Sequence, residues 1–172
     1  MAATDRMPET QNFLSPLGFR FVLSRSPEIN YFVQNVTLPD MTIGAATMPT
    51  PFTRVPLPGD KVTFGDLSIT FKVDENMVNF QHIYDWIAGL AKLDSFNQYT
   101  ALQAGSSTGA GIVCDATLVV LTSAKNPNKQ ISFTNIFPTS LSGLTFDTTS
   151  GDVSYLQATV TFAIQKYQII EA

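Results

Sequence analysis

The chain has 172 residues, enough for one domain with a hydrophobic core and short of what two domains usually need. Apolar residues make up 44% of it and charged residues only 14%, against about a quarter in a typical soluble chain. A surface with so few charges usually ends up against another subunit. The formal net charge of −4, without any Lys/Arg run, argues against binding nucleic acid through neutralised phosphates.

Cysteine content and hydropathy indicate the compartment. Cys114 is the single cysteine, which excludes an intramolecular disulfide and suits a reducing compartment. Residues 1–15 are polar and mixed in charge, unlike a signal peptide, and we expect them to form a flexible arm. No apolar stretch approaches the roughly 20 residues of a membrane helix. We therefore expect a soluble product, made in a cytoplasm and without membrane anchoring.

Apolar and polar residues alternate at the start of the chain. Residues 17–23 predict a strand with one apolar face, and residues 31–38 are a second candidate strand. Residues 40–66 contain Pro49, Pro51, Pro56 and Pro58, and proline cannot donate to a sheet ladder. The segment is therefore expected to be an extended arm or edge hairpin that turns at Pro58-Gly59. Its apolar residues have no core of their own, which indicates that they pack on something else.

In the middle of the chain, the spacing of the apolar residues changes from that of a strand to that of a helix. Residues 67–73 alternate as a strand, and Asp74-Glu75-Asn76 offers acceptors where a helix should begin. From Asn79 an apolar stripe at helical spacing runs for about three turns, and Asp94-Ser95 is expected to end that helix. Trp86 lies off the stripe, so it either covers the edge of the core or faces a neighbour.

The remainder reads as strands. Residues 104–111 predict a glycine-rich loop, 115–122 and 130–137 predict strands, and 153–169 alternate as one long strand. With about seven strands, the fold class is mainly β, an antiparallel β-sandwich or barrel with one flanking α-helix and a protruding proline-rich hairpin arm. There are no internal repeats, so we expect residues 1–172 to form a single domain.

Residue types that carry chemistry are sparse. His82 is the only histidine and no nucleophile stands near it in a triad pattern, so it is read as a solvent-facing or interface residue. One His and one Cys cannot supply a tetrahedral zinc set, and residues 104–111 lack the lysine of a phosphate loop. The sequence thus predicts no metal, no cofactor and no catalytic residue, and indicates a structural protein rather than an enzyme.

One block of the sequence has an order of motifs that is specific enough to indicate a protein family. Leu38-Pro39 follows a strand, Arg54-Val55 lies among the prolines, and PGDKVTFGDLSITFKVDENMVNFQHIYDWIAGL comes next. Further on, ISFTNIFPTSLSGLTFD and an alternating C-terminal stretch follow a lysine-bearing turn. Over roughly residues 17–167 this pattern resembles the tail tube protein family of contractile-tailed, T-even-type bacteriophages. The tubes of type VI secretion and of extracellular contractile injection systems share that family's fold.

The resemblance implies a structural subunit of a phage tail tube, located in the virion and assembled in the host cytoplasm. Six copies would form a ring whose sheets join into an inner barrel, and rings would stack through residues 40–66 into a conduit for genome delivery. The tail sheath protein, a baseplate or tube initiator and a tail terminator would be its partners. DNA would pass through the lumen without specific binding.

Candidate contact and lumen residues follow from this picture. Contacts between rings or subunits are expected at Arg54, Pro58, Gly59, Asp60, Lys61, Asp85 and Trp86. Lumen-facing candidates are Asp115, Asp147, Asp152, Gln157, Thr159 and Thr161. The arm residues could instead be a solvated hairpin tip, and the three carboxylates could lie on the outer surface or in loops.

Other functions stay open at this point. A baseplate tube initiator or the tube protein of a secretion or contractile injection system would share the fold. A β-barrel binding module, for instance for carbohydrate, belongs to a different class and would need clustered exposed aromatic residues.

Overall fold

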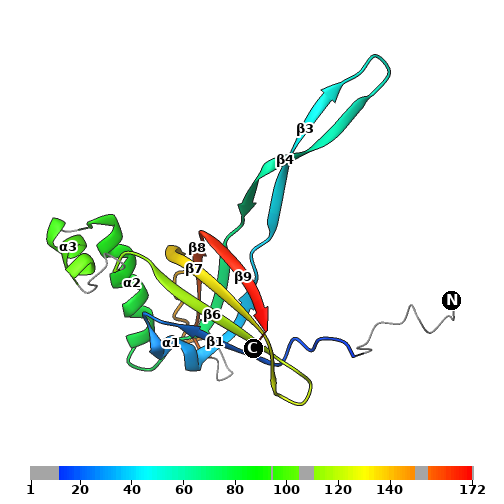
Figure 1. Ribbon diagram of the computed structural model, residues 1–172. Helices are drawn as coiled ribbons and strands as arrows, with labels where there is room; N and C mark the ends of the chain where they lie inside the picture. The colour runs from blue at the N-terminus through cyan, green and yellow to red at the C-terminus, as the bar shows by residue number, and fades with distance from the viewer. Residues whose placement is uncertain (1–11, 94, 105–110, 150–154, 172) are drawn as a thin grey trace.

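The computed structural model describes residues 12–93, 95–104, 111–149 and 155–171 (Figure 1). Within these residues there are nine strands and three helices. The strands are β1 (Phe19–Leu23), β2 (Val33–Thr37), β3 (Met41–Pro49), β4 (Arg54–Phe64), β5 (Leu67–Lys72), β6 (Cys114–Leu121), β7 (Pro127–Leu141), β8 (Gln157–Ala163) and β9 (Lys166–Glu171). The helices are α1 (Pro27–Phe32), α2 (Val78–Ala91) and α3 (Phe96–Ala104).

The strands form one large sheet and one separate hairpin. The large sheet has the order β1-β6-β7-β8-β5-β2, with β9 also paired to β7, and every pairing is antiparallel. β3 and β4 pair only with each other and project from the body as a long arm (Figure 1). The expected mainly β, antiparallel fold with a protruding hairpin is confirmed. The sheet does not close. β1 and β2 lie at the two ends of the strand order, and each has one edge that pairs with no other strand.

Strand β7 connects the two halves of the large sheet. Its first part pairs with β6 and β9, and its last part pairs with β8. The register shifts between Cys114 and Ala116, where Asn135 has a positive φ of 53°. The Asp115 carboxylate accepts the Asn135 N–H at 3.0 Å. Such a bulge bends a strand, and here it allows the sheet to wrap around a core.

The core lies between the halves of the sheet and is covered by α2. Its largest buried side chains include Phe21, Phe71, Phe133 and Phe162, which come from strands of both halves. Trp86 of α2 is 1% exposed, and its ring centroid lies 6.0 Å from that of Phe162.

Three helices are present rather than the single one expected. Residues 31–38 were predicted as a strand, but α1 occupies their first part, because Pro27 at the first helical position favours the start of a helix. α3 was not predicted, since the apolar residues of Phe96–Ala104 do not gather on one face. No helix in the described part of the chain is long and apolar enough to cross a membrane.

The start of α2 also differs from expectation. Asp74 and Glu75 do not cap it: the residue before the helix is Met77, with a left-handed φ of 55° and no side-chain cap. Asn79 organises this corner instead. Its buried amide donates to the Lys72 carbonyl at 2.9 Å and accepts the Asp74 N–H at 3.2 Å.

The prediction of one long strand over residues 153–169 is wrong for the part that the structure describes, which begins at residue 155. Two strands, β8 and β9, share this region, and they pair in different halves of the sheet. The buried residues Ala158, Val160 and Phe162 of β8 are even-numbered, whereas Tyr167 and Ile169 of β9 are odd-numbered. The apolar alternation therefore changes phase at Gln165-Lys166, which was the available signal for the break. Gln165 N–H donates to the Thr134 carbonyl at 3.3 Å where the chain crosses between the halves.

Candidate functional site

The arm formed by β3 and β4 is the most exposed element of the molecule. Every residue of β3 is exposed. The arm turns at Thr50–Thr53, where the Thr50 N–H donates to the Thr53 carbonyl at 3.0 Å and the Thr50 hydroxyl accepts the Thr53 N–H at 3.1 Å. The expected turn at Pro58-Gly59 is therefore wrong, because those residues lie within β4.

Pro58 and Gly59 belong to an irregularity halfway along the arm. Ile43 pairs with Val62 and Ala45 pairs with Pro58, so Gly44 faces the three residues Gly59, Asp60 and Lys61. A Cβ on Gly59 would lie 2.4 Å from the Gly44 carbonyl oxygen. Only glycine permits this approach, so the Pro-Gly signal marks a bulge rather than the turn.

The arm presents apolar side chains without an internal core. Arg54, Asp60 and Lys61 are exposed. The exposed apolar residues are Met41 (62%), Ile43 (57%), Met48 (49%), Phe52 (98%), Leu57 (43%) and Val62 (49%). An isolated two-stranded hairpin is at best marginally stable in water. These side chains therefore need a surface supplied by another molecule.

A second candidate surface lies on the side of β2, β5, β8 and β7 that faces away from the core. We call it the polar face: Asn35, Thr37, Ser68, Thr70, Ser140, Gln157, Thr159 and Thr161. Register places these residues in rows across the strands, with Thr70 opposite both Asn35 and Thr159. Thr161 lies opposite both Ser68 and Ser140.

Hydrogen bonds hold the polar face together. The Thr70 and Thr159 hydroxyls lie 3.1 Å apart. Gln157 Nε2 donates to Gln34 Oε1 at 2.8 Å, which links β8 to β2. Small hydroxyl and amide groups satisfied in this way give a wettable surface without net charge. The structure thus brings the predicted Gln157, Thr159 and Thr161 together on β8.

Two of the three acidic lumen candidates, Asp115 and Asp147, lie away from the polar face. Asp115 is exposed on β6, where it orders the bulge at Asn135. Asp147 lies in a loop, and hydrogen bonds from the Thr149 hydroxyl and N–H lower the pKa of its carboxyl. Asp152 lies outside the described residues.

The remaining predicted residues lie on α2. Asp85 is exposed, whereas Trp86 is buried and its Nε1 donates to the Ile112 carbonyl at 3.1 Å. Of the two alternatives for Trp86, the burial supports the one in which it covers the core. His82 is 42% exposed, and its Nδ1 lies 3.3 Å from a Glu28 carboxylate oxygen.

A polar hollow of about 400 Å³ lies beside Trp86. The Arg25 guanidinium lies 4.8 Å from the Trp86 ring centroid and donates to the Gly111 carbonyl. Burial lowers the pKa of Arg25. Its hydrogen bond and ring contact give this cation a structural role. No group of three or more metal-ligating side chains occurs among the described residues.

Sequence reasoning missed several exposed features. Phe52 was not singled out, although it occupies the turn of the arm between Pro51 and Thr53. Thr70 of the polar face was also missed. It alternates with core residues in the clearest predicted strand, and its polar side chain was the available signal that this side of the strand faces away from the core. Phe146 and Tyr155 were not singled out, although they are 72% and 68% exposed and line one cavity.

Solved structures share this fold. No protein-family model matches the chain, and no curated protein matches it. A chain from the cryo-EM structure of the anti-feeding prophage tube-terminating cap superposes with a TM-score of 0.68 and 16% identity, covering 100% of both chains. A chain from the sheath–tube complex of the extracellular contractile injection system PVC gives 0.65 and 14%, covering 100% of this chain and 99% of that one.

A further solved structure matches with a lower TM-score. Hcp1 from Flavobacterium johnsoniae gives a TM-score of 0.51 at 14% identity, covering 90% of this chain and 96% of that one. The chain therefore has the fold found in contractile injection systems and in Hcp proteins. The resemblance to tail tube proteins seen in the sequence is confirmed at the level of this fold.

Proposed function

We propose that the chain is a tube subunit of a phage contractile tail, in which hexameric rings stack into a hollow conduit. The observation that carries the proposal is the arm, which projects from the body with its apolar side chains exposed. In a monomer, the apolar side chains of the arm would stay exposed to water and would not stabilise the fold. A stack of rings can cover it, because each arm extends beyond its own body toward the next ring.

Ring formation is supported by the open sheet. β1 and β2 are unpaired at its two ends, and exposed edges invite pairing with another chain. Edge pairing between six neighbours would close their sheets into one inner barrel. The low content of charged residues, 14%, fits a surface that is largely covered in this way.

The polar face is proposed to line the lumen. The residues that define it are uncharged; the cation Lys72 lies on the same side of β5, opposite Gln157 in register, at one end of the face. Six copies would carry a formal charge of −24 (6 × −4), which repels phosphates. DNA would then slide through the tube without binding. Asp115 and Asp147 are proposed to contribute to this potential from positions outside the polar face.

The contacts of the assembly are proposed as follows. Arg54, Pro58, Gly59, Asp60 and Lys61 of the arm contact the next ring. The exposed Asp85 on α2 faces a neighbouring subunit or the sheath. The baseplate or tube initiator and the tail terminator would contact the two ends of the tube in the virion.

A second candidate function is a component that ends the tube. Superposition on a chain of the tube-terminating cap structure covers the full length of both chains, so this fold also occurs there. A cap or initiator would form one ring and stop, whereas a tube subunit adds ring after ring. Polymerisation therefore separates the two functions.

The test is negative-stain electron microscopy of the purified chain over a range of concentration, alone and with purified baseplate complex as a seed. We expect sixfold rings at low concentration and hollow tubes at high concentration or on the seed. Single rings that never lengthen would support the cap or initiator. A persistent monomer under both conditions would refute the proposal and return attention to a β-barrel binding module.

The lumen is tested with Thr159→Lys, which adds a cation to the polar face of every copy. We expect assembled wild-type tubes to leave double-stranded DNA fragments unretarded in a gel. Tubes of the variant should bind DNA in a salt-dependent manner. Gln81→Lys adds the same charge at an exposed position of α2 and serves as the control. DNA binding by both variants alike would contradict the lumen assignment.

A further inference from the structure

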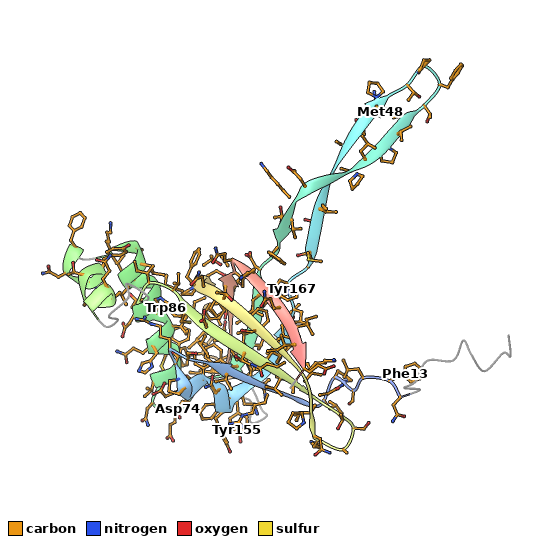
Figure 2. All side chains as sticks on the ribbon, in the orientation of Figure 1. Phe13, Met48, Asp74, Trp86, Tyr155 and Tyr167 are labelled. Atoms are coloured by element: carbon orange, nitrogen blue, oxygen red, sulfur yellow. The ribbon has the colours of Figure 1, made fainter. Side chains whose placement is uncertain are left out.

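A cavity lies at the end of the body opposite the arm. It has a volume of about 560 Å³ and is bounded by the end of β5, the approach to α2 and the start of β8. Figure 2 shows Met48 on the arm, with Asp74 and Tyr155 at the far end of the body. The lining includes Phe32, Asp74, Glu75, Met77, Phe146 and Tyr155.

The lining of this cavity is apolar and open. Phe146 and Tyr155 are 72% and 68% exposed, so their rings lack cover in the single chain. The wall is nevertheless ordered, because the Val73 N–H donates to the Leu156 carbonyl at 2.9 Å. Lys72 Nζ lies 4.8 Å from the Tyr155 ring centroid, on one side of the opening. Asp74 and Glu75 supply negative charge at the rim.

The tip of the arm has complementary chemistry. Phe52 is 98% exposed at the turn, with no surface of its own chain around it. Arg54 follows two residues later and is also exposed. The tip therefore combines one aromatic side chain with one cation, and the cavity combines an aromatic wall with two carboxylates and with Lys72 on one side of its opening.

We propose that Phe52 of one copy inserts into this cavity of a copy in the adjacent ring, with Arg54 facing Asp74 and Glu75. The tip and the cavity lie at opposite ends of one molecule, so a chain cannot fill its own cavity (Figure 2). A contact between two different patches is heterologous and repeats without limit, which is what a growing stack requires. This inference rests on the proposed tube function and assigns its stacking contact.

The first test truncates each partner. Phe52→Ser and Tyr155→Ser should both leave sixfold rings intact and raise the protein concentration needed for tubes by about tenfold or more, as expected for a buried aromatic anchor. Phe96→Ser is the matched control, since Phe96 is 77% exposed on α3, far from both surfaces, and its tubes should match wild type. Circular dichroism should show that all three variants are folded.

The second test reverses charge. Arg54→Glu and Glu75→Arg should each weaken stacking several-fold, and the double variant should regain it to within about threefold of wild type, because opposite charges then face each other again. Failure of the double variant to recover would overturn the charge pairing.

Three outcomes separate the inference from the function on which it rests. Normal tubes from Phe52→Ser would overturn the inference and leave the tube function standing. Loss of tubes in Phe52→Ser together with normal tubes in Tyr155→Ser would place the tip elsewhere on the next ring, again overturning the cavity assignment. Absence of rings and tubes from the wild-type chain, with and without the baseplate seed, would refute both.

Discussion

Replacement of Trp86 by alanine separates two roles that the sequence left open. If Trp86 packs in the core, Trp86→Ala should destabilise the isolated chain. If it faces a neighbouring subunit, the same change should leave the isolated chain stable and weaken assembly. The structure favours the first outcome, since the side chain is 1% exposed.

The magnitude follows from what surrounds the ring. Removing a buried Trp side chain typically lowers the free energy of unfolding by about 3–5 kcal/mol, from lost burial and the cavity left behind. Trp86 also loses its hydrogen bond to the Ile112 carbonyl and its contact with the Arg25 guanidinium. We therefore expect a loss of about 4 kcal/mol. Trp86→Phe keeps most of the packing and removes the N–H donor, for an expected loss of about 1–2 kcal/mol.

The assay is urea unfolding of the chain below its assembly concentration. Far-UV circular dichroism is the appropriate signal, because Trp86 is the only tryptophan and the variants lose indole fluorescence. Tyr84→Ala, on the same helix but 51% exposed, is the control and should lose less than about 1 kcal/mol. If Trp86→Ala unfolded within about 1 kcal/mol of wild type yet failed to form rings, the packing argument would be refuted.

The other predictions concern the arm, the bulge and the thiol. Deletion of residues 56–62 should leave each monomer folded by circular dichroism and abolish tubes by microscopy; loss of the fold would show that the arm is internal. Asn135→Ala should lower the free energy of unfolding by about 1–2 kcal/mol in urea, because φ is 53° there, and Asn135→Gly should lose less. Burial raises the pKa of the Cys114 thiol to about 12, so at pH 8 it stays protonated. Folded protein should react with a thiol reagent at least about tenfold more slowly than protein in urea, and equal rates would contradict this burial.

The local elements that the sequence predicted well are those with a short-range signal. Residues 67–73 alternate with period two, and β5 forms there with Leu67, Ile69 and Phe71 buried. The proline-rich segment could not be a central strand, because proline lacks the N–H that a ladder requires. It forms the projecting hairpin.

Errors occurred where a longer-range interaction decides the outcome. Pro58-Gly59 has the composition of a turn, but the facing Gly44 makes it a bulge within β4. Residues 153–169 were predicted as one strand, yet the apolar alternation changes phase at Gln165-Lys166, and pairing with two halves of a sheet divides the region into β8 and β9. Periodicity records which side of a strand is apolar and contains no information on which partner covers it.

For the candidate surfaces too, some features could be predicted from the sequence and others depended on the tertiary structure. Composition alone indicated a structural protein with little charge, and the sequence located an arm with apolar residues and a run of polar residues at Gln157, Thr159 and Thr161. Only the tertiary structure joined those residues to Ser68 and Thr70 in one face, buried Trp86, and placed Phe52 and the Phe146–Tyr155 cavity at opposite ends of the molecule. The reason is physical: residue type and spacing set local conformation, whereas a surface is assembled by pairing and burial between segments that lie far apart in the chain.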